Sequence, residues 1–149
     1  MVSLVVLTLL ASPFLMITRY RIDTGRAAWA QVPEKQALVD FLEAHAPTDA
    51  IVLIDPQLEN SNLDFERRTG HPSLVMWKFV PTNDPQILEW YRRLEFRKAL
   101  FADGVCARHN AYSPRFLLVT PEHAVELAKT CGSIVYRSTH LVLLDTSRA

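Results

Sequence analysis

Short apolar runs separated by segments of mixed polarity constrain the fold of this chain more than any other feature. Five of them follow residue 49, namely AIVLID (50–55), SLVMW (73–77), RFLLVT (115–120), SIVYRS (133–138) and HLVLLD (140–145). Continuous apolar runs of this length are typical of strands that are covered on both faces of a sheet. The last two runs flank a tight connection, which indicates an antiparallel hairpin.

The segments between these runs carry the signals of helices. Prolines suit the first turn of a helix, and glycines suit the residue that follows its end. The expected helices cover residues 33–46, 61–70, 85–101 and 121–131. Because strands and helices alternate, we predict an α/β fold of three layers, with a mixed, mainly parallel sheet of about five strands, helices on both faces and a C-terminal β-hairpin.

The start of the chain has a different character. Residues 2–18, VSLVVLTLLASPFLMIT, contain no charged residue and end at Arg19. A helix needs about 20 residues to cross the ~30 Å of hydrocarbon in a bilayer. A cleaved signal peptide and a buried helix of a soluble protein stay open as alternatives. We predict a transmembrane helix over 1–20, a juxtamembrane linker over 21–32 and a soluble α/β domain over 33–147.

Composition excludes several classes of function. The 16 basic and 16 acidic residues balance, so no net charge points to a nucleic-acid partner. With 4 glycines in the whole chain, the glycine-rich loops that bind phosphates or dinucleotides are excluded. No histidine or cysteine spacing fits a metal site, so we expect neither a metal nor a cofactor. Cys106 and Cys131 could form a disulfide in an oxidising compartment or remain two small hydrophobic residues in the cytoplasm.

Residues 30–147, with the apolar helix before them, resemble the soluble C-terminal domain of multi-spanning bacterial membrane proteins of glycosyltransferase (GT-C-like) architecture, or of related membrane families. The resemblance rests on TGHPSLVMWKFVP, ILEWYRRL and the closing stretch from RFLLVT to LVLLDT. Its matching positions are Arg67, Thr69, Gly70, Pro72, Trp77, Lys78, Pro81, Glu89, Trp90, Tyr91 and Arg93. His71 and Met76 depart from it, standing where Arg and Asp are expected.

The resemblance implies a location and a set of partners. It implies a domain outside the cytoplasm, attached to a bilayer, beside upstream transmembrane helices and a lipid-linked sugar. It also implies that the catalytic carboxylate lies in an early loop of the parent protein, so that this domain is itself not catalytic. By the positive-inside rule alone, Arg19, Arg21 and Arg26 would face the cytoplasm, unless helices upstream set the topology.

Candidate ligand-binding residues follow the apolar runs. Asp55 and Lys78 each follow one of the expected strands, at the end where α/β folds place ligands. Asp55 also suits a turn before Pro56, because aspartate side chains stabilise turns. Lys78 suits an anionic group such as a phosphate, or a salt bridge to Glu89 or Asp84.

Three further residues complete the candidate set. Arg67, beside Arg68, could bind a phosphate through two hydrogen bonds. Alternatively, one of the two arginines is solvated and the other caps a carbonyl. Trp77 and Glu89 flank Lys78 in the matching motif. Trp90 and Tyr91 fall on the apolar stripe of the helix 85–101 and are expected to pack in the core, with a platform for a carbohydrate as the alternative. No residue is assigned a catalytic role.

Three hypotheses for the function stay open. The first is a non-catalytic extracytoplasmic domain that covers or shapes the substrate entrance of a membrane transferase. The second is a single-span α/β enzyme or binding module for a phosphate-bearing ligand, acting through Asp55, Arg67 and Lys78. The third is an interaction module that docks a partner on the helix 85–101.

Overall fold

The computed structural model describes residues 32–104 and 112–148. The described residues from Glu34 onward belong to one compact unit. The predicted transmembrane helix, and all of the predicted linker except Val32, lie outside the described residues, and so does Cys106. Among the residues that are described, no helix has the length and apolar character needed to cross a bilayer.

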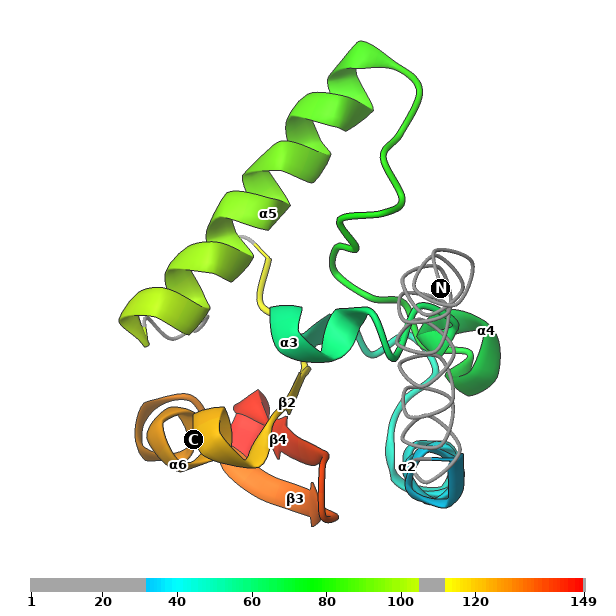
Figure 1. The fold of residues 1–149 in the computed structure, drawn as a ribbon, viewed down its shortest axis with the longest axis vertical. Helices are drawn as coiled ribbons and strands as arrows, with labels where there is room; N and C mark the ends of the chain where they lie inside the picture. The colour runs from blue at the N-terminus through cyan, green and yellow to red at the C-terminus, as the bar shows by residue number, and fades with distance from the viewer. Residues whose placement is uncertain (1–31, 105–111, 149) are drawn as a thin grey trace, which may run out of the picture. The chain divides into compact units, whose positions relative to one another are not determined.

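Helices and strands alternate along the described chain (Figure 1). The first half contains α2 (Val32–His45), β1 (Val52–Ile54), α3 (Pro56–Glu59), α4 (Phe65–Thr69) and the long α5 (Asp84–Asp103). The second half contains β2 (Phe116–Val119), α6 (Pro121–Thr130), β3 (Ser133–Arg137), β4 (Val142–Asp145) and a short 3-10 turn, η2 (Thr146–Arg148). Side-chain caps begin three of these helices, at Asp55, Asn83 and Thr120, and a proline follows closely in each case.

The sheet differs from the prediction. It has four strands in the order β1-β2-β4-β3, and only the β1–β2 pair is parallel. The β2–β4 and β3–β4 pairs are antiparallel, so the prediction of a mainly parallel sheet of five strands was wrong. The reason is that the C-terminal hairpin enters the sheet with β4 beside β2, so the last strand separates the two strands that α6 connects.

The run SLVMW, predicted as a strand, does not form one. Its contact with β1 is a single parallel bridge between Val52 and Ser73. Beyond that bridge, side chains take the place of a neighbouring strand as hydrogen-bond partners of the backbone: Trp90 Nε1 donates to the Met76 carbonyl at 2.9 Å, and the Trp77 amide donates to the Glu59 carboxylate. Buried backbone groups must be satisfied, and here they are satisfied without a strand ladder.

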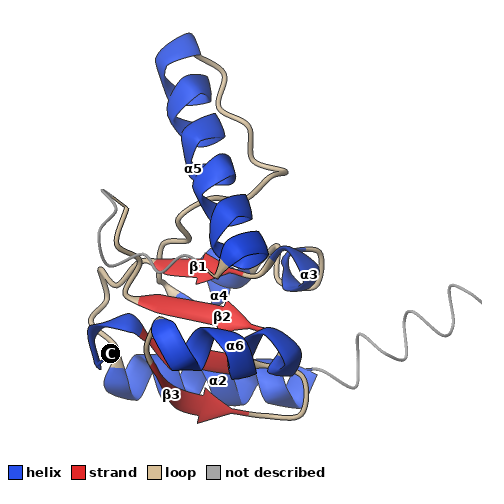
Figure 2. Cartoon of the chain, turned by 90° about the vertical axis from the view of Figure 1, so that its left-hand side faces the viewer, coloured by secondary structure: helices blue, strands red, loops and turns tan. Residues whose placement is uncertain are grey.

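Both faces of the sheet are covered. Alternate strand residues point to opposite sides, and the apolar side chains divide into two clusters accordingly. One face packs with Leu38 and Leu42 of α2 and with Phe65 of α4, and the other packs with α6 and with Leu100 of α5. Figure 2 shows α6 and α2 on the two sides of the strands. This double burial explains why the strands read as continuous apolar runs.

Glu34, near the start of α2, ties that helix to the turn between β3 and β4. Its carboxylate accepts hydrogen bonds from the Ser138 hydroxyl at 2.9 Å, the His140 amide at 3.1 Å and His140 Nδ1 at 3.0 Å. Burial raises the pKa of Glu34, but the hydrogen bonds from His140 and Ser138 outweigh it and leave the pKa below its ordinary value.

Acid is therefore expected to remove the stabilisation that Glu34 provides. A carboxyl group with a lowered folded-state pKa stabilises the fold above its unfolded-state pKa, and loses that effect as the pH falls through its folded-state pKa. In urea unfolding of the full chain in mild detergent, E34Q should be less stable than the natural chain at pH 7. The difference should shrink as the pH falls below about 4.5, the ordinary pKa. A difference that stays constant from pH 7 to pH 3 would contradict this account.

Candidate functional site

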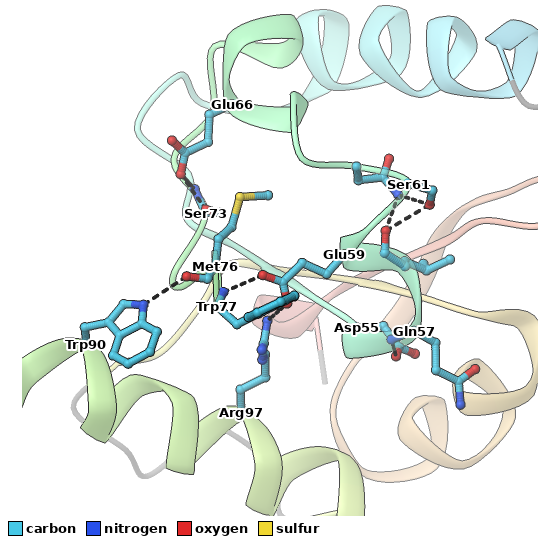
Figure 3. Close-up of polar contacts among 12 residues, drawn as sticks. Asp55, Gln57, Glu59, Ser61, Glu66, Ser73, Met76, Trp77, Trp90 and Arg97 are labelled. Carbon is cyan, nitrogen blue, oxygen red and sulfur yellow. Dashed lines mark hydrogen bonds and ion pairs between the residues drawn. The ribbon is translucent and has the colours of Figure 1, made fainter. Parts of the chain in front are cut away.

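A buried ion pair holds the irregular segment between α4 and α5, residues 70–83. Arg97 of α5 and Glu59 of α3 are 6% and 0% exposed, and Arg97 Nη1 lies 2.6 Å from Glu59 Oε2. The second oxygen of Glu59 accepts the amide of Trp77 (Figure 3). One carboxylate thus joins α3, α5 and the segment at Trp77, and fixes where that segment turns.

Two further side chains of α5 hold the same segment. Trp90 donates to the Met76 carbonyl, and Arg93 Nη1 donates to the Leu74 carbonyl at 3.3 Å. Arg93 Nε also lies 3.0 Å from the Glu89 carboxylate one turn earlier. On this face of α5, Trp90 and Arg93 therefore donate hydrogen bonds to backbone carbonyls of the segment. This role explains why tryptophan and arginine occur together, one turn apart, on the helix.

A hollow of about 540 Å³ lies beside the buried ion pair. Its size falls in the range of small-molecule sites, which are mostly apolar with a few polar groups. The lining residues come from α3, α5 and the irregular segment and are Pro56, Trp77, Leu94, Glu95, Arg97, Lys98, Phe101 and Ala102. The hollow therefore combines aromatic and aliphatic walls with cationic groups.

Trp77, a wall of this hollow, is paired with its neighbour Lys78, which does not itself line the hollow. The Lys78 ammonium lies 5.4 Å from the centre of the Trp77 ring, a cation–π distance. The predicted salt bridges from Lys78 to Glu89 or Asp84 are not among the ion pairs of the described residues. Trp77 is 49% exposed, so about half of this residue is accessible from solvent.

Asp55 lies at the end of β1 and is fully buried. One carboxylate oxygen accepts the Gln57 amide at 2.9 Å, which caps α3. The other oxygen lies 2.5 Å from His123 Nδ1 and 3.3 Å from the Thr120 amide. The side chain of His123 is 32% exposed, so the pair has a buried acid and a histidine that reaches solvent.

This pair occupies a favoured place in the sheet. The carboxyl ends of the parallel neighbours β1 and β2 meet here. The chain leaves β1 toward the cluster of Leu58 and Phe65, and leaves β2 toward the opposite cluster of Ala124 and Leu127. Ligands of open α/β sheets bind outside the carboxyl ends of the strands, which is where this pair lies.

The hollow and the pair adjoin each other. Pro56 lines the hollow and directly follows Asp55. Phe101 also lines the hollow, and its ring centre lies 5.6 Å from that of His123. Of the candidate residues predicted from the sequence, the structure thus brings Asp55, Trp77 and Lys78 to one region.

Arg67 and Glu89 are engaged elsewhere. Arg67 of α4 has a side chain that is 84% exposed and lies 4.0 Å from the Asp64 carboxylate. Glu89 pairs with Arg93 and, at 3.9 Å, with Arg92, and it lines a separate hollow of about 330 Å³ with Trp90. The expectation that Tyr91 packs in the core was wrong, because it is 56% exposed.

Sequence reasoning missed His123, Glu59 and Arg97. A signal for His123 existed: the runs 50–55 and 115–120 were both predicted strands, and polar residues that follow parallel neighbours gather at one edge. Glu59 and Arg97 carried no such signal, because they are 38 residues apart and pair only through the fold. In the described part of the chain, no group of His, Cys, Asp and Glu side chains could hold a metal ion.

Part of the chain is similar to a known protein family. Residues 33–96 match the family model described as a domain of unknown function, DUF6798. The match spans α2 to the first part of α5, including Asp55, Glu59 and Trp77, and ends before Arg97 and His123. No curated protein and no solved structure matches the chain.

Proposed function

We propose that this chain is a membrane-anchored, extracytoplasmic α/β domain without catalytic activity of its own. It is the C-terminal part of a multi-spanning membrane protein of GT-C-like architecture. Its role is to cover or shape the entrance through which a lipid-linked donor or an acceptor reaches the parent protein.

An exposed apolar segment carries this proposal. Trp77, Phe79 and Val80 are 49%, 60% and 51% exposed, and they lie within four consecutive residues. Large apolar side chains grouped on a surface mark contact with another protein domain or a membrane. Leu88 and Tyr91 of α5 are exposed as well, at 60% and 56%. A domain that rests against membrane helices or lipid would cover such side chains.

The state of Cys131 supports the extracytoplasmic location. Cys131, at the end of α6, is buried and disulfide-bonded. Disulfides persist in oxidising compartments and are rare in the cytoplasm. The bond therefore favours the side of the membrane that the sequence resemblance implies.

Labelling in whole cells tests the location. We expect R67C, in the protein as its gene encodes it with any residues upstream of Met1, to react with a membrane-impermeant maleimide in intact spheroplasts. The side chain of Arg67 is 84% exposed, so the label has access. The natural chain is the control for background labelling. Reaction of R67C only after the membrane is broken would overturn the extracytoplasmic proposal, and an upstream coding sequence without further apolar spans would overturn the multi-spanning parent.

A second candidate function is the binding of an anionic, phosphate-bearing ligand. The observation that favours it is the hollow beside the ion pair, whose lining joins the half-exposed indole of Trp77 to the ammonium of Lys98. Its ligand and its test are developed in the next subsection.

A further inference from the structure

We propose that His123 is a proton acceptor, oriented by Asp55, for a hydroxyl-bearing anionic ligand that binds in the hollow lined by Trp77 and Lys98. This proposal rests on the second candidate function and is an alternative to the non-catalytic role proposed first. It is independent of the membrane location. It assigns Asp55 a positioning role and His123 the chemical role.

The hydrogen bond to Asp55 selects the tautomer of His123. An ionised carboxylate only accepts hydrogen bonds, so the His123 nitrogen that faces it, Nδ1, carries the proton. In neutral His123 the lone pair is then on Nε2, the nitrogen available for chemistry. The Asp55 carboxylate also accepts the amides of Gln57 and Thr120, which fix its position. A carboxylate that holds Nδ1–H in this way stabilises the imidazolium that forms when Nε2 takes up a proton.

Access distinguishes this pair from a purely structural contact. The Asp55 side chain is 0% exposed whereas that of His123 is 32% exposed, so the acid is shielded and the imidazole is reachable. The ring of His123 lies against Phe101, which is also a wall of the hollow. His123 does not itself line the hollow, but it contacts the wall residue Phe101, so a ligand that extends past Phe101 would meet the imidazole.

The lining of the hollow indicates the class of ligand. The Trp77 indole offers a flat apolar face, which suits the apolar face of a sugar or another ring. Lys98 contributes an ammonium to the wall, and Lys78, outside the lining, lies over Trp77. Arg97 is neutralised by Glu59, and Glu95 adds one negative charge. The ammonium groups of Lys98 and Lys78 stand against Glu95 and favour an anionic group, such as a phosphate, on a ring that also carries hydroxyl groups.

The proposed step is a proton transfer. The Nε2 lone pair of His123 takes the proton of a ligand hydroxyl, so that an O–H bond breaks and an N–H bond forms. The positive charge on the imidazolium then lies beside the negative charge of Asp55. The proton returns from Nε2 to an oxygen of the product, which restores the neutral imidazole.

Chemical modification of the full chain tests the reactivity of His123. With diethyl pyrocarbonate at about pH 8.5, where imidazoles are mostly neutral, we expect His123 to be modified faster than His45, as measured by peptide mass spectrometry. His45 is the control because its Nδ1 contacts the Phe41 carbonyl at 2.9 Å instead of a carboxylate, and its ring is exposed. D55N should slow modification of His123 by about tenfold, because the amide can donate to Nδ1 and place the proton on Nε2.

Asparagine also caps helices, so D55N is expected to fold. Its melting temperature checks this. If the Asp55–His123 pair had only a structural role, D55N would lower the melting temperature without changing the rate at which diethyl pyrocarbonate modifies His123. If His123 in the natural chain reacts no faster than His45, the proposed reactivity is wrong, whether or not D55N folds.

Protection by glucose 1-phosphate tests the ligand. The sugar phosphate should slow modification of His123. His140 pairs with Glu34 and does not line the hollow, so it should react at an unchanged rate. W77A and K98A should each abolish the protection. Protection by inorganic phosphate alone would remove the ring from the ligand class. A fast His123 that no sugar phosphate protects would overturn the hollow as the binding site and, with it, the second candidate function.

Discussion

Replacement of Arg97 by alanine is expected to lower the free energy of unfolding by about 3–5 kcal/mol, because it leaves a buried carboxylate without its counter-charge. Glu59 is 0% exposed and its Oε2 lies 2.6 Å from Arg97 Nη1. Without Arg97, α5 also loses its link through Glu59 to the segment at Trp77, because the Trp77 amide donates to the same carboxylate. Urea unfolding of the full chain in mild detergent, followed by circular dichroism, measures the change.

Arg92 on the same helix provides the matched control. Its side chain is 70% exposed and its contact with Glu89 is 3.9 Å long. Exposed pairs of this kind contribute about 0–1 kcal/mol, so R92A should be nearly neutral. The double variant E59M/R97M should recover much of the stability lost in R97A, since a buried pair replaced by apolar groups is often neutral. Equal losses in R97A and R92A would show that the buried pair does not hold α5.

The second large effect is expected at Phe65, where F65A should cost about 3–5 kcal/mol. Phe65 begins α4, is 0% exposed and packs in the cluster that α2 shares with the sheet. Alanine removes the ring and leaves a cavity that the neighbouring strands cannot fill, because their backbones are fixed by the ladder. The same unfolding measurement gives the change, with the midpoint shifting to lower urea concentration.

Phe79 tests whether burial causes the effect at Phe65. It is the same residue type but is 60% exposed, so F79A should change the free energy of unfolding by less than about 0.5 kcal/mol. A loss at Phe79 comparable to that at Phe65 would show that the exposed segment is part of the stabilising core, and would remove the observation that carries the proposed docking role.

The helices were predictable because their signals are local. Pro85 after the Asn83 cap, and Pro121 after the Thr120 cap, set the starts of α5 and α6. The helix predicted over 61–70 shortened to α4, and α3 was missed, because its four residues are too few to show a periodicity.

The candidate site was only partly predictable. Asp55 and Trp77 were identified because each adjoins an apolar run, a relation that one sequence displays. Their partners were not, since His123 contacts Asp55 across 68 residues and Arg97 contacts Glu59 across 38. A pairing over such distances depends on the strand order, which no local pattern encodes.

The sequence by itself determined the α/β composition, the helix starts, the C-terminal hairpin and the double burial of the strands, because hydrophobic runs, prolines and caps act within a few residues. Only the tertiary structure decided that β4 lies between β2 and β3, and that the SLVMW run binds side chains of α3 and α5 in place of a strand. The physical reason is competition: an apolar run satisfies its backbone with whichever donors and acceptors the fold brings near, and that choice is made by residues far away in the chain.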